Sequence, residues 1–267
     1  MTAEPASAPT VEIPAQPPAR RWPLLAPALG LVGFFALWEA VASLGLVPKT
    51  LLPAPSDIPR AWQGEITGGF WWDSVLGSLS HYVSGLVLGS GFGLALGVAC
   101  GLLPRLETSL QWVVRVLRPI PGLAWVPFAI IWFGISPTAA TFIIGIAVFW
   151  INFFAALGAV QAVDRDLIEV AQAFGHGSLM GRLRKVVLPA ALPGMLSGLR
   201  TGLGQAWMAV VAAELFGIPG VGARMMQAAS LLATDLVVVY MLTMALLYGI
   251  TDSLFEFARR RLLAWQR

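Results

Sequence analysis

Hydrophobic residues along this chain gather in long runs that are separated by short polar segments. A helix needs about 20 apolar residues to cross the roughly 30 Å hydrocarbon core of a bilayer. Six runs reach that length, and they cover residues 24–46, 77–103, 109–133, 137–160, 193–215 and 236–258. The third run contains three prolines, so we expect it to be kinked. The pattern predicts an all-α membrane protein with six transmembrane helices.

The composition favours the same class of protein. Hydrophobic residues make up 57% of the 267-residue chain and charged residues only 12%, whereas an ordinary soluble domain is about 25% charged. Residues 1–19 are rich in proline and alanine, which predicts a disordered cytoplasmic tail ahead of a transmembrane domain at 20–267. The first apolar run is too long for the core of a secretion signal, so we expect an uncleaved first helix.

Basic residues are distributed unevenly between the two sides that six spans create. With the N-terminus in the cytoplasm, all but three of the 17 arginines and lysines fall at or near the inner face, and the exceptions are Lys49, Arg60 and Arg224. Cytoplasmic loops of membrane proteins carry such an excess of positive charge. We therefore expect both termini, and the polar segment at 161–192, to lie in the cytoplasm.

Glycines recur at every fourth position in two of the predicted spans. They are Gly85, Gly89, Gly93, Gly97 and Gly101 in the second span, and Gly194, Gly198 and Gly202 in the fifth. On a helix this spacing makes a smooth face, which lets another backbone approach closely inside a membrane. The helix that packs there belongs either to the same subunit or to a second one.

Several functional classes are excluded by motifs that the chain lacks. Its two lysines, Lys49 and Lys185, do not stand in a G-x-x-x-x-G-K-[ST] phosphate loop. The motifs H-E-x-x-H and G-x-S-x-G are also absent, and Cys100 is the single cysteine. We therefore expect no catalytic activity and no ATP, metal or other cofactor bound by this chain. It also lacks a basic run interleaved with aromatic residues, so we expect no nucleic-acid partner.

Polar residues inside the predicted spans are candidates for a pathway through the membrane, because such residues are costly in lipid and usually functional. Asn152 and Gln205 lie near mid-membrane, where they either bond neighbouring helices or line a wet pathway. Arg200 lies close enough to the inner end of its span for its side chain to reach the interface. Asp252 could pair with Arg259 or with a neighbouring helix. The pathway candidates are Asn152, Arg200, Gln205 and Glu214.

The polar segment at 161–192 has the pattern of two short helices. Asp166 and Glu169 resemble a capping box at the start of the first helix, and Gly175 is placed to end it. Ser178 is placed to cap a second helix at 179–187, which Pro189 and Pro193 should end. An apolar stripe follows the first helix at Leu167, Val170, Ala171 and Phe174. A short helix with such a stripe and no core of its own favours a protein partner.

This segment also resembles a known family. Glu169-Val170-Ala171, Gly175 and Val186-x-Leu188-Pro189 are similar to the cytoplasmic signature E-A-A…G…I-x-L-P of permease subunits in binding-protein-dependent ABC importers. Three further stretches resemble the branch that imports aliphatic sulfonates, taurine, nitrate and bicarbonate. They are RPIPGLAWVPFAIIWFGI at 118–135, LPAALPGMLSGLRTGLGQAW at 188–207 and VAAELF at 211–216.

The resemblance implies a type I importer permease core and a coupling helix that docks into a separate ATPase. The implied coupling residues are Glu169, Val170, Ala171, Phe174, Gly175, Leu188 and Pro189. It further implies ATP and magnesium bound by that ATPase, an extracytoplasmic binding protein, a second permease copy in a homodimer and a bacterial inner membrane whose lipid surrounds the spans. The expected function is import of a small anion. A stand-alone channel or a secondary carrier is the alternative.

Overall fold

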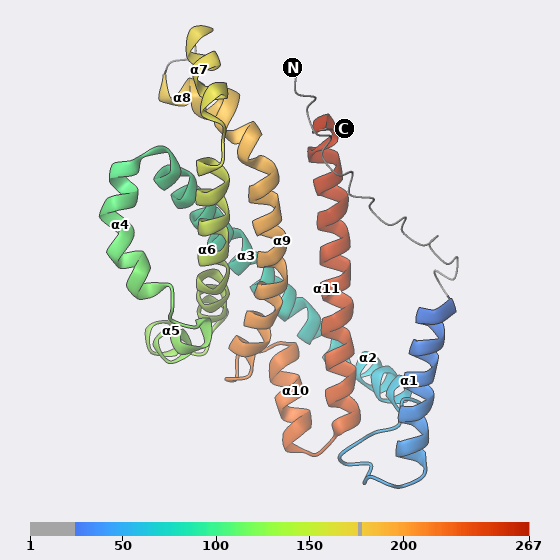
Figure 1. Cartoon of the computed structure of the whole chain (residues 1–267). Helices are drawn as coiled ribbons and strands as arrows, with labels where there is room; N and C mark the ends of the chain where they lie inside the picture. The colour runs from blue at the N-terminus through green and yellow to red at the C-terminus, as the bar shows by residue number, and fades with distance from the viewer. Residues whose placement is uncertain (1–24, 176–177, 267) are drawn as a thin grey trace, which may run out of the picture.

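The computed structural model describes residues 25–175 and 178–266, and every regular element within them is helical (Figure 1). In chain order these elements are α1 (Leu25–Ser43), α2 (Ile58–Thr67), α3 (Phe70–Leu102), α4 (Pro104–Leu117), η1 (Gly122–Trp125), α5 (Val126–Phe133), α6 (Pro137–Gln161), α7 (Arg165–Ala173), α8 (Leu179–Arg182), η2 (Leu183–Val187), α9 (Leu188–Glu214), α10 (Val221–Ser230), α11 (Thr234–Leu262) and η3 (Ala264–Gln266). The predicted all-α class is confirmed. The tail predicted at 1–19 lies outside the described residues.

The bundle has two distinct ends. Helices α7 and α8 project from one end, and α10 lies at the other (Figure 1). We call these the α7 end and the α10 end. The long helices α3, α6, α9 and α11 connect the two ends (Figure 1). Helices α3, α6 and α11 run from the α10 end to the α7 end, and α9 runs in the opposite direction, as the predicted alternation of spans requires.

The predicted spans are confirmed in part. Within the described residues, four helices are long and apolar enough to cross a membrane, namely α3, α6, α11 and the stretch Leu179–Glu214. The third predicted span is broken, because α4 and the pair η1–α5 meet at 86°. The break falls between Leu117 and Gly122, where Pro119 and Pro121 lack the N–H groups that would continue a helix. The first predicted span is the shorter apolar helix α1.

Helix α6 lies between α3 and α9 and contacts both along its length. Gly85, Gly89, Gly93, Gly97 and Gly101 of α3 all pack against α6, where Gly89 meets Gly145 and Gly93 meets the backbone at Phe149. On the opposite side, Gly194 and Gly198 of α9 pack against the small side chains Ala159 and Ala155 of α6. The glycine faces therefore serve packing within one subunit, which decides between the two predicted alternatives.

The α10 end is held together by buried polar contacts. Arg224 of α10 forms two hydrogen bonds with Glu65 of α2, at 2.9 and 3.1 Å, and Tyr240 of α11 donates a third. Burial raises the pKa of Glu65, but the hydrogen bonds from Arg224 and Tyr240 outweigh it and keep that pKa below its usual range. Trp71 of α3 donates to Thr243 of α11 at 2.9 Å. These contacts fix the short helices α2 and α10 against the bundle.

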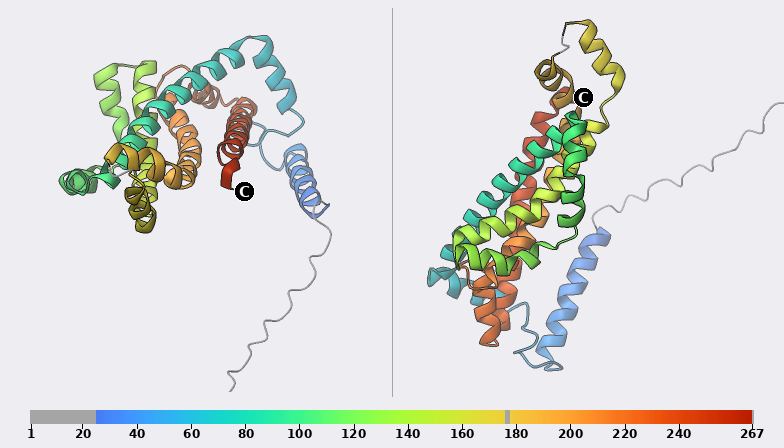
Figure 2. Two further views of the ribbon diagram at one scale, coloured as in Figure 1. Left: turned by 90° about the horizontal axis from the view of Figure 1, so that it is seen from above. Right: turned by 90° about the vertical axis from the view of Figure 1, so that its left-hand side faces the viewer.

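Helix α1 stands apart from the other long helices in both further views (Figure 2). It is tied to the segment that follows it, since Trp38 donates to the carbonyl of Pro53 and Ser56 donates to Glu39. Apolar side chains such as Leu31 and Phe34 are exposed along it. An apolar helix of this kind is compatible with a lipid surrounding.

The close packing of α3 on α6 gives a test of the fold. A methyl group at Gly93 would lie 2.5 Å from the Phe149 carbonyl oxygen, whereas one at Gly91 would meet nothing within 4 Å. Gly93→Ala should therefore destabilise the protein by about 1–3 kcal/mol through overpacking, and the matched control Gly91→Ala should not. Thermal unfolding in detergent would measure the difference. Equal unfolding temperatures for the two variants would contradict the packing.

Candidate functional site

The segment at the α7 end is built from two capped helices. Asp164 begins α7 by accepting a hydrogen bond from the N–H of Asp166 at 3.0 Å, so the cap lies two residues before the predicted one. The predicted capping box at Asp166 and Glu169 is thus wrong, because the residue that caps the helix is Asp164. Gly175 follows the end of α7 with φ +82°, a left-handed conformation that suits glycine, as predicted. Ser178 caps α8 by accepting from the N–H of Gly181 at 3.1 Å, also as predicted.

The predicted stop at the two prolines is wrong. Helical structure continues from Leu179 through Glu214, with Pro189 in the first turn of α9 and Pro193 inside it. Both prolines lack the N–H group that a helix interior uses, but membrane helices tolerate interior prolines. The helix instead changes geometry upstream, where η2 is a π-helical turn.

The exposed surface of α7 and its C-terminal cap carries large apolar side chains among polar ones. Leu167 and Val170 are half exposed and Phe174 is 78% exposed, so three large apolar side chains point away from the bundle. Glu169 and Pro189 are also exposed, whereas Leu188 is half buried and Ala171 is buried. The structure therefore presents most of the predicted coupling residues at one end of the molecule.

The other side of this segment is seated on the bundle. Val187 and Ala191 are buried in a cluster with Ala156 and Val160 of α6. A small cavity between them is lined by residues from α3, α6, α7, α8 and η2, including Ile168 and Arg182. A force applied to the exposed face of α7 would thus reach the ends of α3, α6 and α9.

Asn152 and Gln205 occupy different surroundings. Asn152 on α6 is fully buried, and its amide donates to Ser90 Oγ of α3 at 2.9 Å and to the Val148 carbonyl at 3.0 Å. It therefore makes the helix–helix contact that was one of its two predicted roles. Gln205 on α9 is half buried.

Glu214 is fully buried where α3, α9 and α10 meet. Its carboxylate accepts from Ser78 Oγ at 2.8 Å and from the N–H of Gly222 at 2.8 Å, and it lies 3.0 Å from His81 Nδ1. Ser78 in turn accepts from the N–H of Val221 at 2.9 Å. The N-terminus of α10 thus faces a carboxylate, which favours the negative charge. Sequence reasoning missed Ser78, because it is 136 residues from Glu214 in the chain.

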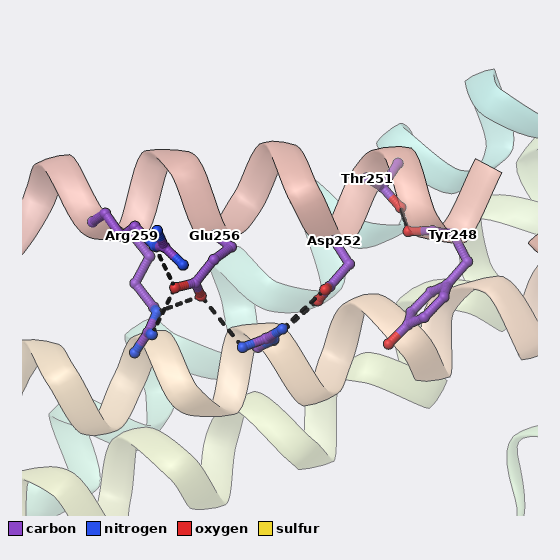
Figure 3. A network of polar contacts seen from close by, with 7 residues as sticks. Tyr248, Thr251, Asp252, Glu256 and Arg259 are labelled. Atoms are coloured by element: carbon purple, nitrogen blue, oxygen red, sulfur yellow. Dashed lines mark hydrogen bonds and ion pairs between the residues drawn. The ribbon is translucent and has the colours of Figure 1, made fainter. Parts of the chain in front are cut away.

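Arg200 of α9 is bound to two carboxylates of α11. It donates to both oxygens of Asp252, each at 2.9 Å, and to Glu256 at 3.3 Å. Figure 3 shows Asp252 and Glu256 on the same face of α11, with Arg259 contacting Glu256. Asp252 therefore pairs across helices, the second of its two predicted alternatives. Glu256 was not predicted, although an acidic residue one turn from Asp252 on the same face was a usable signal.

Long apolar helices that could cross a membrane, with a segment protruding from one end, are the features of a membrane-embedded subunit. Comparison with known proteins makes this specific. Residues 89–264 match the family model of the binding-protein-dependent transport system inner membrane component. The chain belongs to this family, and it is accordingly the permease subunit of an ABC importer rather than a stand-alone channel or a secondary carrier. The resemblance found in the sequence is confirmed.

Individual relatives cover three quarters or more of the chain. The putative aliphatic sulfonates transport permease protein SsuC of Bacillus subtilis is 33% identical, over 91% of this chain and 87% of its own length. The taurine transport system permease protein TauC of Escherichia coli is 34% identical, over 92% of each chain. The bicarbonate transport system permease protein CmpB of Synechocystis is 33% identical, over 76% of each.

The fold also matches solved structures. An inward-facing structure of the MetNI methionine ABC transporter aligns with a TM-score of 0.61, covering 75% of this chain and 97% of that one at 23% identity. This likeness confirms the predicted type I importer permease core.

Proposed function

We propose that this permease carries a small anion such as an alkanesulfonate, taurine, nitrate or bicarbonate into the cell. The single observation that carries the proposal is the similarity, over most of the chain, to permeases named for aliphatic sulfonates, taurine and bicarbonate. The cargoes in these names share a compact oxyanion group. Specificity would come mainly from the binding protein that delivers the cargo.

Uptake into sealed vesicles tests this function. The permease reconstituted with its ATPase and binding protein should import ethanesulfonate, taurine or bicarbonate when ATP is supplied. Vesicles given a non-hydrolysable ATP analogue are the control. Import of a neutral sugar or a cation in preference to every anion tried would contradict the proposal.

ATP hydrolysis belongs, in this proposal, to a separate ATPase subunit that binds ATP and magnesium. The chain itself binds no cofactor, because neither of its lysines stands in a phosphate loop. An extracytoplasmic binding protein delivers the cargo. Two copies of the permease form a homodimer within the lipid of a bacterial inner membrane, and closure of the ATPase pair rocks them between inward-open and outward-open states.

The α7 end would then lie in the cytoplasm together with both chain termini. The excess of arginine and lysine on that side supports this orientation. A cysteine introduced at position 60, in a chain whose Cys100 is replaced, should react with a membrane-impermeant reagent added to intact cells. A cysteine at position 182 should not. Labelling at position 182 would reverse the proposed topology.

The coupling site is the exposed face at the α7 end, with Glu169, Val170, Phe174, Gly175 and Pro189 at the surface. Ala171 and Leu188 support it from beneath. Exposed apolar side chains on a helix that is seated firmly on the bundle suit a groove on a partner protein. Within the membrane, Arg200 and Gln205 would contact the pathway, while the buried Asn152 and Glu214 would act on it by holding the helices that line it.

Removal of the most exposed apolar side chain tests the coupling site. Phe174→Ala should weaken binding of the ATPase at least about tenfold, because aromatic anchors dominate interface energies. Gly175→Arg should weaken it as well, since arginine is strained at φ +82°. Trp265→Ala, which removes another exposed aromatic side chain, is the matched control. Affinity would be measured by titrating the ATPase onto detergent-solubilised permease, and unchanged affinity in both variants would exclude this site.

A further inference from the structure

The half of α11 nearer the α7 end has two chemically different faces. Tyr248, Asp252 and Glu256 follow one another at intervals of four residues and point toward α9, where Arg200 contacts the two carboxylates (Figure 3). Apolar side chains on the opposite face are exposed, and they are Leu246, Ile250, Leu254 and Phe257. Charged side chains inside a membrane almost always face a wet cavity or the interior of the bundle rather than lipid. The seam between α9 and α11, where 45% of the Arg200 side chain is accessible, is therefore a candidate border of the pathway, and the apolar face suits a lipid surrounding.

This half of α11 is held by apolar and polar contacts together, since the partly buried Met244, Leu247 and Phe255 pack against the core cluster that contains Trp207. The buried residues of α11 are Val239, Tyr240 and Thr243, and all three lie toward the α10 end. Beyond them, α11 is joined to α9 by the Arg200 ion pairs and by a hydrogen bond from Trp207 to Thr251 at 3.0 Å. Helix α11 is thus most deeply buried toward the α10 end, and toward the α7 end the Arg200 ion pairs are the charged contacts that join it to α9.

The ion pairs leave one uncompensated positive charge. Arg200, Arg259 and Arg260 face Asp252 and Glu256, so the cluster carries a net charge of +1. Glu256 keeps Arg259 and Arg260 as partners if Arg200 moves away, whereas Asp252 has no second ion-pair partner among the described residues. Departure of Arg200 would therefore leave Glu256 paired, and Asp252, 22% of whose side chain is accessible, would be the carboxylate left without an ion-pair partner.

We propose that the Arg200–Asp252 ion pair closes the pathway at the α7 end, and that Arg200 exchanges Asp252 for the transported anion during release. Arg200 holds Asp252 through two parallel N–H···O bonds. A sulfonate, nitrate or bicarbonate group offers the same pair of oxygens to a guanidinium fork. A monovalent anion also neutralises the net charge of the cluster. This inference rests on the proposed anion cargo.

Two variants distinguish binding of the anion by Arg200 from a purely structural role of the ion pair. Arg200→Gln combined with Asp252→Asn removes both charges together, so neither partner is left unpaired and the fold should survive. We expect normal ATPase binding and unfolding temperature but uptake below about a tenth of the wild-type rate.

Asp252→Asn alone leaves Arg200 free to hold the anion. Its uptake should be inhibited by cytoplasmic-side anion at a concentration at least about fivefold lower than for the wild type.

The measurement uses vesicles that contain the complete transporter, with ethanesulfonate, taurine and bicarbonate as probes. Arg261→Gln, which removes an exposed arginine near the same end, controls for loss of positive charge. Wild-type uptake by the double variant, or unchanged inhibition of Asp252→Asn, would overturn the inference while the anion function stands. Failure of the wild type to import any of the three anions, with import of a neutral solute, would remove the proposed function and this inference together.

Discussion

The architecture depends on how closely α3, α6 and α9 approach one another in lipid, which does not drive helices together. Lipid tails are as apolar as leucine, so contact area and shape must replace the hydrophobic effect. Glycines on α3 and on α9 let both backbones lie directly against α6, from Gly85 near one end to Gly194 near the other. Every functional feature is placed by this core: α6 and α9 carry the segment with the exposed apolar face, and α9 presents Arg200 to α11.

The two ends of the bundle are stabilised by different chemistry. At the α10 end the carboxylates of Glu214 and Glu65 are buried and bonded on several sides, so opening it would strand charge in a medium of low dielectric constant. At the α7 end the ion pairs of Arg200 are partly exposed, with 45% of its side chain accessible, and such pairs contribute little net stability. Opening the α10 end would therefore cost more free energy than rearranging the ion pairs at the α7 end.

Sequence patterns predicted the local features well, because each rests on neighbouring residues. Hydrophobic runs located the long helices, the glycine spacing identified packing faces, and Gly175 and Ser178 marked helix ends. Contacts between distant residues were not accessible in this way: no pattern links Ser78 to Glu214 or Arg200 to Asp252. The continuation of α9 through Pro193 was missed because lipid-embedded helices tolerate a break that would end a soluble helix. For the 86° turn between α4 and the pair η1–α5, the prolines correctly predicted a bend but could not give its angle.

The uninterrupted helical path from Leu179 to Glu214 has a mechanical consequence. It contains 36 residues, and at about 1.5 Å per residue it is roughly 54 Å long, well beyond the thickness of a bilayer core. Such a rod acts as a lever: a tilt of a few degrees at one tip displaces the other by several ångströms. The π-helical turn at η2 departs from α-helical geometry within this rod, so the angle that this turn adopts would set how much of a cytoplasmic push arrives at the far side of the membrane.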